Sequence, residues 1–368
     1  MPVPSVGGEP EAWLGLDLIA GLGSGGIRVL LNHYGSPAQI LQCSFAQLSP
    51  LVGDKAARAI GKGPDQSKLK AALTWLEGAD NHLLTLADCD YPAPLLEIAD
   101  PPPILYLKGR REMLNRTGIA VVGSRNATPA GIANAEAFSR TLSQAGLTII
   151  SGMALGIDAA AHRGGLDGNG SSIAIVGTGL DLVYPARNKT LARDLVEHGL
   201  IISEFSLETP ALAQNFPRRN RLISGLSRGV LVVEAALASG SLITARQAAE
   251  QGREVFAIPG TIHSPVSKGC HLLIKQGAKL VDDANDILVE LQWHNAAGKP
   301  DSSIFLDGRK ELSNAEPILK AMGYDPVSID ALVERVDLPA EQVVVRLAEL
   351  EIEGAIAAMP GGKYQRLF

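Results

Sequence analysis

Arginine side chains gather in one short stretch of this 368-residue chain. Three guanidinium groups fall within four positions, and on a helix Arg218 and Arg221 would lie on one face. No acidic residue is nearer to them in the sequence than Glu208, so we expect the cluster to bind an anion, and the planar guanidinium group suits phosphate. The stretch consists of Asn215, Phe216, Pro217, Arg218, Arg219, Asn220 and Arg221.

Five glycine-bearing turns each follow a run of apolar residues. Such a turn lets backbone N–H groups converge on an anion at the start of a helix. A single turn commonly only caps a helix, whereas five at one sheet edge could hold an extended polyanion. Arg187, shortly after the third turn, is included in the expected site. The turns are Gly123-Ser124-Arg125, Ser151-Gly152-Met153-Ala154-Leu155-Gly156, Gly177-Thr178-Gly179, Ser239-Gly240-Ser241-Leu242-Ile243-Thr244 and Pro259-Gly260-Thr261.

Side chains for catalysis are scarce. The chain has no GxxxxGK[ST] phosphate loop, no HExxH zinc motif and no GxSxG nucleophile turn. Asp158 and His162 lie four positions apart on an expected helix and could form an acid–base pair, but we favour hydrogen bonds that stiffen the glycine-rich turn. His263, Cys270 and His271 offer three ligands at a spacing unusual for a metal. We therefore expect no catalytic residue, no metal and no cofactor, and a protein that is not an enzyme.

Six continuous apolar runs, rich in β-branched residues, alternate with helical stretches in the middle of the chain. Such strands are typical of a parallel sheet covered on both faces, so we expect a doubly wound α/β domain. Ligands in this class bind beyond the carboxyl ends of the strands, where the glycine turns lie. Glu204 and Glu234 also end strands and could orient arginines of the site. The runs are residues 119–122, 147–150, 173–176, 200–202, 230–233 and 255–258.

The first eighty residues have apolar positions at helical spacing and no strand-like alternation. The run from Gly21 to Gly26 matches GxGxxG, but a dinucleotide site needs a preceding strand and residues 14–20 look helical, so we reject that interpretation. Gly23 and Gly53, each followed by a helical stretch, resemble paired helix-hairpin-helix or SAM-like units. Contact with a DNA backbone or a protein stays open beside a plain packing role.

Residues 311–368 read as three helices followed by a hairpin and resemble a winged helix. They carry 5 basic and 10 acidic residues, which opposes phosphate binding, so we expect a protein-interaction or fold-stabilising module. The expected domains are a helical domain at 1–80, an α/β domain at 81–295, a linker at 296–310 and the winged helix at 311–368.

The net charge of −6 argues against a nucleic-acid partner only as an average over the chain. Residues 117–292 carry 15 basic and 15 acidic side chains, so most of the acidic excess lies in the C-terminal part. The three cysteines lie far apart, and the sequence shows neither a leader nor a membrane span, so we expect a cytoplasmic protein without membrane contact. Aromatic residues make up only 4%, so base stacking would contribute little.

Four ordered motifs occupy the expected sheet edge, at residues 123–125, 151–158, 216–224 and 239–245. With Tyr91-Pro92 and the proline-rich segment 101–109, they resemble the DNA-processing protein A family, DprA or Smf. The likeness covers nearly the whole chain. It departs at His271, where the family usually has Asn.

This resemblance implies a Rossmann-like domain that binds single-stranded DNA and dimerises through that domain. It further implies a mediator that protects incoming DNA and loads the RecA recombinase during natural transformation, without catalysing a reaction. Arg125 would grip phosphate, Ser151, Gly152, Ala154 and Gly156 would shape the adjoining pocket, and Arg218, Asn220 and Arg221 would form its basic wall.

The alternative is a nucleotide- or ribose-phosphate-processing enzyme on a similar sheet, with Asp158, His162 or Glu204 as acid–base groups. The expected DNA-binding residues are Gly123, Ser124, Arg125, Ser151, Gly152, Ala154, Gly156, Arg187, Phe216, Arg218, Arg219, Asn220, Arg221, Ser239, Gly240, Ser241 and Thr244.

Overall fold

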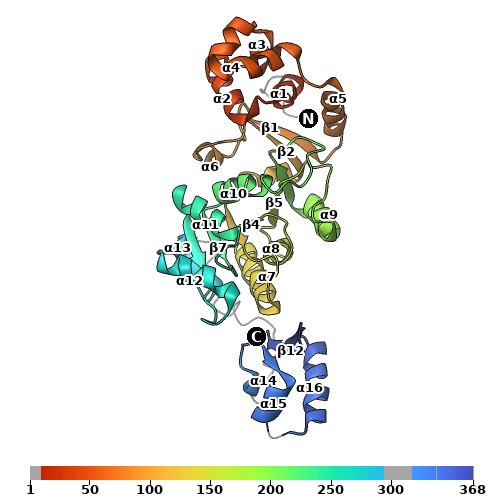
Figure 1. The fold of residues 1–368 in the computed structure, drawn as a ribbon, viewed down its shortest axis with the longest axis vertical. Helices are drawn as coiled ribbons and strands as arrows, with labels where there is room; N and C mark the ends of the chain where they lie inside the picture. The colour runs from red at the N-terminus through yellow and green to blue at the C-terminus, as the bar shows by residue number, and fades with distance from the viewer. Residues whose placement is uncertain (1–9, 294–316, 337, 368) are drawn as a thin grey trace.

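The computed structural model describes residues 10–293, 317–336 and 338–367. Figure 1 shows these residues along one long axis, with helices of the N-terminal part at one end, a large sheet in the middle and a smaller helical module at the other end. The linker expected at 296–310 lies outside the described residues.

Five helices precede the sheet, and the first four of them enclose an apolar core of their own, in which Leu16, Ile27 and Leu30 are buried. Gly23 (φ 63°) begins the second helix, and Gly53 (φ 79°) divides the fourth into two halves, so both glycines occupy a left-handed turn between helical segments. A helix rather than a strand precedes the GxGxxG run, which confirms that this run is no dinucleotide site. The helices are α1 Pro10–Asp17, α2 Gly23–Tyr34, α3 Pro37–Gln42, α4 Phe45–Lys62 and α5 Gln66–Leu76.

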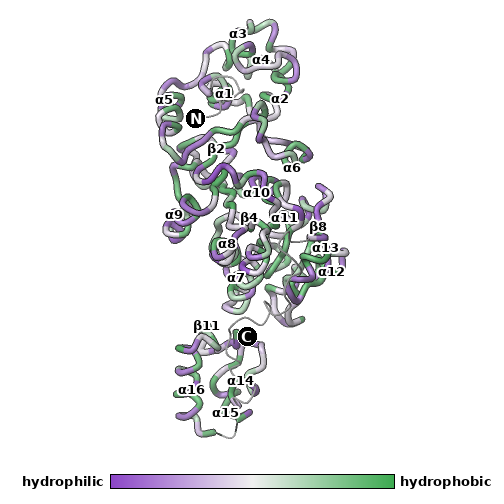
Figure 2. The backbone as a smooth tube through the Cα atoms, turned by 180° about the vertical axis from the view of Figure 1, so that it is seen from behind, coloured by the Kyte–Doolittle hydropathy of each residue, from purple (hydrophilic) through white to green (hydrophobic). Residues whose placement is uncertain are grey.

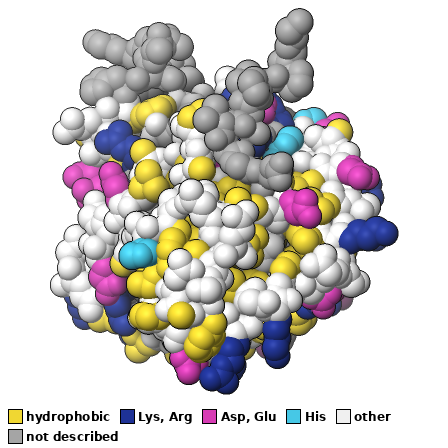
Figure 3. Space-filling model, turned by 90° about the horizontal axis from the view of Figure 1, so that it is seen from above, with side chains coloured by type: hydrophobic (Ala, Val, Ile, Leu, Met, Phe, Trp, Pro, Cys, Tyr) yellow, Lys and Arg dark blue, Asp and Glu magenta, His cyan; other side chains and the backbone are white. Residues whose placement is uncertain are grey.

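The outer surface at this end of the molecule carries mixed charge. Seen from above, Lys and Arg side chains are interspersed with Asp and Glu around the face, and hydrophobic side chains lie between them (Figure 3). For example, the exposed side chains of Arg58 and Asp54 form an ion pair, with 3.3 Å between Arg58 Nη2 and Asp54 Oδ2. Among the described side chains of the face drawn, Lys and Arg do not gather into one basic patch, and a docking role for these helices stays a prediction.

A nine-stranded sheet forms the centre of the molecule, in the order β1-β2-β6-β5-β4-β3-β7-β8-β9. The seven strands β3 to β9 are all parallel to one another in the sheet. At one edge, β2 pairs antiparallel with β6, and β1 pairs antiparallel with β2. This confirms the expected doubly wound, mostly parallel α/β sheet. The strands are β1 Asn81–Thr85, β2 Ile104–Gly109, β3 Gly118–Val122, β4 Thr148–Ser151, β5 Ser172–Ile175, β6 Leu200–Ser203, β7 Gly229–Val232, β8 Glu254–Ala257 and β9 Lys279–Leu280.

Helices cover both faces of the sheet because alternate strand residues point to opposite sides. Ala120 and Val122 pack with α10, α11 and α12, whereas Ile119 and Val121 pack with α7, α8 and α13. The helices are α6 Ala93–Leu96, α7 Pro129–Gln144, α8 Ile157–Leu166, α9 Lys189–His198, α10 Asn215–Gly225, α11 Ser241–Glu250, α12 Lys268–Lys275 and α13 Ala284–Glu290, with 3-10 turns η1 Arg111–Met113, η2 Ala186–Asn188 and η3 Pro265–Ser267.

The chain reverses its direction of winding at β3. From β3 it proceeds through β4 and β5 to β6 on one side, and then returns to place β7 on the other side of β3. The loops that leave β3 and β7 therefore diverge, and such a switch point is where doubly wound sheets bind ligands.

The C-terminal module has three helices and a three-stranded sheet of order β10-β12-β11. It confirms the expected winged helix, with a core that includes Leu319, Leu332 and Leu347. Its elements are α14 Pro317–Met322, β10 Val327–Ser328, α15 Ile329–Arg335, α16 Ala340–Ile352, β11 Ile356–Met359 and β12 Lys363–Arg366.

The N-terminal helices join the sheet at β2. Trp13 and Leu14 of α1 and Leu69 of α5 belong to the same apolar cluster as Tyr106. The Tyr106 hydroxyl donates a hydrogen bond to Asp17 Oδ2 over 2.7 Å. Burial raises the pKa of Asp17 to about 6, although this hydrogen bond and the charge of Arg218 oppose the rise.

We predict that Asp17→Asn removes a pH dependence of stability. The folded-state pKa of about 6 lies above the usual 3.8, so protonation favours folding: the stabilisation is complete below pH 3.8 and is lost as pH rises through 6. Asn accepts the Tyr106 hydrogen bond without charge, so the variant should be more stable than the wild type at neutral pH by about 1 kcal/mol. Urea unfolding at acidic and neutral pH measures this difference, and an equal pH dependence in both proteins would contradict it.

Candidate nucleic-acid interface

A groove of about 700 Å³ opens at the carboxyl ends of β3 and β7, between the first turns of α10 and α11. Two helix N-termini thus open into it, and neither has a side-chain hydrogen bond from its N-cap residue. At α11, Ser241 N donates to Ser239 Oγ at 3.3 Å and Leu242 N donates to the Ser239 carbonyl, so this helix end attracts an anion through the helix dipole rather than through free N–H groups. Eleven of the expected residues line this groove: Gly123, Ser124, Arg125, Ala154, Phe216, Arg219, Asn220, Ser239, Gly240, Ser241 and Thr244.

Arg125 is the exposed cation of this groove. Its guanidinium carbon lies 5.3 Å from the centre of the Phe216 ring, and no ion pair to it occurs among the described residues. The preceding residue is fixed, because Ser124 O accepts a hydrogen bond from Ile157 N over 3.1 Å and Ser124 Oγ accepts one from Asn126 N. A rigid turn therefore presents an uncompensated guanidinium group to the groove.

The turn between β4 and α8 packs against the Arg125 turn and is itself held by hydrogen bonds. Asp158 Oδ2 accepts hydrogen bonds from Gly152 N at 3.2 Å and Ala154 N at 3.4 Å, and His162 Nε2 accepts one from Met153 N at 3.2 Å. Burial lowers the pKa of His162 to about 3, so the ring is neutral and can act as this acceptor. Burial also raises the pKa of Asp158, against the opposing charge of Arg219. The prediction that both side chains stiffen the turn is confirmed.

Arg219 forms the floor of the groove rather than an exposed wall. Only 3% of the residue is exposed, and its guanidinium group donates to the Ile175 carbonyl beneath the β4–α8 turn. A methyl group at Gly152 would lie 1.8 Å from Arg219 Nη1, so glycine is required there. Burial lowers the pKa of Arg219 to about 10, with Asp158 opposing the shift, so the group stays cationic at neutral pH.

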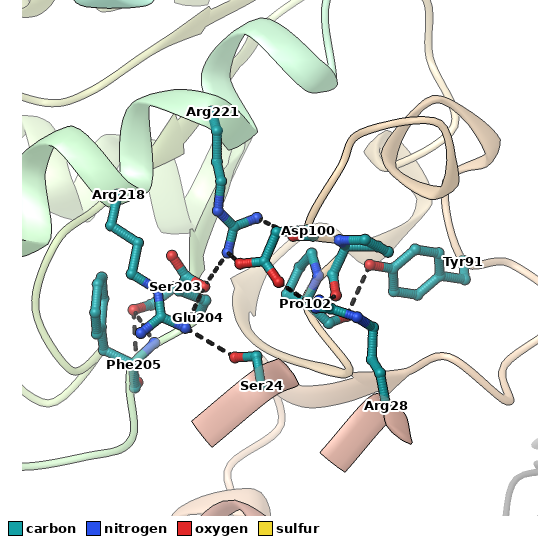
Figure 4. Close-up of polar contacts among 11 residues, drawn as sticks. Ser24, Arg28, Tyr91, Asp100, Pro102, Ser203, Glu204, Phe205, Arg218 and Arg221 are labelled. Atoms are coloured by element: carbon teal, nitrogen blue, oxygen red, sulfur yellow. Dashed lines mark hydrogen bonds and ion pairs between the residues drawn. The ribbon is translucent and has the colours of Figure 1, made fainter. Parts of the chain in front are cut away.

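Arg218 and Arg221 lie outside the groove lining, and Figure 4 shows both side chains extending from their helix toward Glu204. Arg221 forms ion pairs with Glu204 and, at 3.5 Å, with Asp100; Arg218 pairs with Glu204 at 3.2 Å. The expectation that the arginine cluster lacks acidic partners is therefore wrong, because the fold brings in acids distant in sequence. Glu204 does orient two arginines, Arg218 and Arg221, but these lie outside the groove and not in the site where the expectation placed them.

Residues of these ion pairs also contact helix α2 of the N-terminal part (Figure 4). Arg218 Nη2 donates to Ser24 Oγ of α2 over 2.8 Å. Arg28, one turn further along α2, pairs with Asp100 and donates to the Pro101 carbonyl over 2.9 Å. We call Arg28, Asp100, Glu204, Arg218 and Arg221 the junction network. It links α2, the segment before β2, the end of β6 and α10.

The remaining expected residues lie outside the groove lining. Ser151 Oγ is buried and donates to the Val121 carbonyl over 2.6 Å, which ties β4 to β3. Gly152 lies over Arg219, and Gly156 (φ 75°) lies so close to the Ser124 carbonyl that a methyl group would be 2.3 Å from it. Arg187 is exposed on η2.

Two further predictions on this edge have mixed outcomes. Among the described residues, no arginine pairs with Glu234; it accepts hydrogen bonds from Thr128 Oγ1 at 2.6 Å and Thr128 N at 3.0 Å, at the start of α7. Two of the five expected glycine turns, residues 177–179 after β5 and residues 259–261 after β8, do not line the groove. Three of the expected turns therefore contribute to it. His271 interacts through Nε2 with the Gly260 carbonyl at 2.9 Å.

The groove lining also includes residues outside the expected site, among them Asn126 and Tyr184. Asn126 follows Arg125 directly, and Tyr184 comes from the loop after β5, with its ring centre 5.8 Å from that of Phe216. Tyr184 is 48% exposed, and an aromatic residue just after a strand-end turn was the signal that could have identified it. The two rings border the groove beside Arg125.

The described residues contain no cluster of three His, Cys, Asp or Glu side chains that could hold a metal ion. Over the same parts of the chain, no helix is long and apolar enough to cross a membrane.

Comparisons with known proteins agree with this arrangement. A family model described as DNA recombination-mediator protein A matches residues 82–292, and one described as DprA winged helix domain matches residues 310–362. Protein Smf of Escherichia coli K12 is 43% identical over 363 residues, which span 98% of this chain and 96% of that protein.

Two solved structures are similar as well. DNA processing protein A from Streptococcus pneumoniae aligns with a TM-score of 0.70 and 36% identity over 78% of this chain and 99% of that one. DNA processing protein A from Helicobacter pylori, described for its single-stranded DNA binding mode, aligns with a TM-score of 0.53 and 28% identity over 58% of this chain and 97% of that one. From its matched domains and its full-length relative, the chain belongs to the DNA recombination-mediator protein A family.

Proposed function

We propose that this protein binds single-stranded DNA in the groove at the β3–β7 switch point. The observation that carries the proposal is the uncompensated guanidinium group of Arg125, held by a rigid turn beside two helix N-termini and above the buried charge of Arg219. Arg125 and the helix N-termini attract phosphate and read no base edge, while Arg219, whose charge Asp158 balances, fixes the floor of the groove, so binding should tolerate any sequence and weaken with salt. The similar Helicobacter protein, described for its single-stranded DNA binding mode, supports this proposal.

The exposed ring of Tyr184 and its neighbour Phe216 favour single strands over duplex. Unpaired bases can stack on aromatic faces, whereas paired bases are already stacked within a helix. These are the two aromatic rings that line the groove in the described part of the chain, so stacking should supplement the phosphate contacts rather than replace them.

We further propose that the protein acts in the cytoplasm as a non-enzymatic mediator, which protects incoming DNA and loads RecA during natural transformation. Membership of the recombination-mediator family supports this role. We also propose a homodimer through the Rossmann-like domain, where exposed apolar side chains such as Leu272 of α12 and Leu280 of β9 offer contact area. The alternative of a nucleotide-processing enzyme has no specific support, because Asp158 and His162 are engaged with backbone N–H groups and Glu204 with arginines.

We predict that Arg125→Ala weakens binding of an oligothymidylate about tenfold, because one charge-assisted phosphate contact is lost. The slope of log Kd against log salt should also become shallower by about one phosphate contact. Fluorescence anisotropy across a salt series measures both quantities. Arg246→Ala, which removes an exposed arginine of α11 outside the groove lining, is the matched control and should leave them unchanged. Equal affinities for wild type and Arg125→Ala would contradict the proposal.

We predict a different outcome for Arg221→Met. This substitution leaves Glu204, whose side chain is 1% exposed, with one arginine partner in place of two, so the protein should lose about 3 kcal/mol of stability. The double variant Arg221→Met/Glu204→Gln should recover part of the lost stability, because it no longer carries the buried carboxylate charge. Thermal unfolding measures stability, and oligothymidylate affinity should stay within about twofold. If Arg221→Met instead lost oligothymidylate affinity while its stability stayed unchanged, Arg221 would belong to the DNA-binding surface.

A further inference from the structure

Helix α16 of the winged-helix module is apolar on two opposite sides. Val343, Leu347 and Leu350 are fully buried and pack into the core of the module. They lie three or four positions apart, which is the spacing of one face of a helix. This face accounts for the attachment of α16 to α14, α15 and β11, and leaves the opposite side of the helix to solvent.

The solvent side of α16 carries a second set of apolar residues. Val344 is 47% exposed, Val345 60% and Ile352 88%, and Ala348 between them is exposed as well. Positions 344, 348 and 352 follow one another at single helical turns, and 345 lies next to them, so the four form one continuous strip. We call Val344, Val345, Ala348 and Ile352 the outer stripe. Single exposed apolar residues are common on proteins, whereas an aligned stripe marks an interaction surface.

The exposure of the outer stripe agrees with the position of α16 in its module. In Figure 1 and in the reversed view of Figure 2, α16 lies at the outer edge of the module, and its tube in Figure 2 is banded with hydrophilic and hydrophobic residues. The helix has 13 residues and is therefore about 20 Å long. This length matches about three turns of a partner helix packed alongside it.

Carboxylates border the outer stripe. Glu341, Glu349 and Glu351 of α16 and Glu353 just beyond it are exposed, against one basic residue of the helix, Arg346. Arg346 pairs with Glu349 at 2.8 Å and with Glu353 at 3.6 Å, so its charge is directed to one edge. An apolar stripe edged by acids is complementary to apolar anchors edged by lysine or arginine.

This charge pattern decides among possible occupants. Duplex DNA would bring phosphates against carboxylates, and a second copy of α16 would bring its own carboxylates against them. We propose that the outer stripe of α16 docks a basic amphipathic helix of a partner protein. The site lies on a different module from the groove and is independent of DNA binding there.

The test uses the full-length protein and a labelled helical peptide of about 20 residues, with leucine at positions i, i+3, i+4 and i+7 and lysine elsewhere. Two matched peptides serve as controls: one with the same composition in scrambled order, and one with glutamate in place of lysine. The variant Val345→Ser/Ile352→Ser removes two exposed anchors, and Val289→Ser, at a residue of α13 that is 63% exposed, is the matched control variant. Fluorescence anisotropy gives the affinities, and thermal unfolding checks that each variant remains folded.

The wild type and Val289→Ser should bind the leucine–lysine peptide equally, while Val345→Ser/Ile352→Ser should bind about tenfold more weakly. The scrambled and glutamate peptides should also bind at least about tenfold more weakly. The proposal would be overturned if the double variant bound the leucine–lysine peptide with the affinity of the wild type, or if the wild type did not bind this peptide. Loss of a homodimer in the double variant by light scattering would identify a second copy as the occupant instead, and loss of duplex affinity would identify DNA. Oligothymidylate affinity should be the same in all variants, so this test fails or succeeds separately from the proposed groove.

Discussion

A guanidinium group buried beneath a glycine turn determines the form of the groove. Arg219 reaches from α10 under the β4–α8 turn, and only glycine at position 152 leaves room for it. Asp158 balances its charge and at the same time holds the turn through backbone N–H groups. Because this pair is buried and already compensated, it fixes the geometry of the floor, and the exposed Arg125 above it is left to bind a ligand.

Helix α10 divides the arginine cluster between two tasks. Phe216, Arg219 and Asn220 line the groove, whereas Arg218 and Arg221 belong to the junction network with Glu204 and Asp100. Burial raises the pKa of Glu204, and the two arginines oppose that rise. The network anchors the helix that carries the groove and joins it to α2 through Ser24. The N-terminal helices are therefore connected to the DNA-binding surface that we propose, although they do not line it.

The sequence was sufficient for the six strands β3 to β8 and for eleven residues of the groove lining, but not for the strands β1, β2 and β9 at the two edges of the sheet. Buried parallel strands are continuous apolar runs, so the positions of β3 to β8 could be predicted, and a glycine turn that ends a strand marked Arg125. The partners of Arg218 and Arg221 could not be predicted, because Asp100 and Glu204 approach them only through the tertiary fold. The outer stripe of α16 escaped notice as well: in a sequence, an apolar residue at helical spacing does not reveal whether it lies inside or outside.

The central claim is that the groove binds single strands through their phosphates, and one binding series tests it most directly. Oligothymidylate, oligodeoxycytidylate and a duplex of equal length are titrated into the full-length protein at several salt concentrations, with affinity read by anisotropy. We expect equal affinities and equal salt slopes for the two single strands, and weaker binding of the duplex. Binding that does not change with salt, or that favours the duplex, would contradict it.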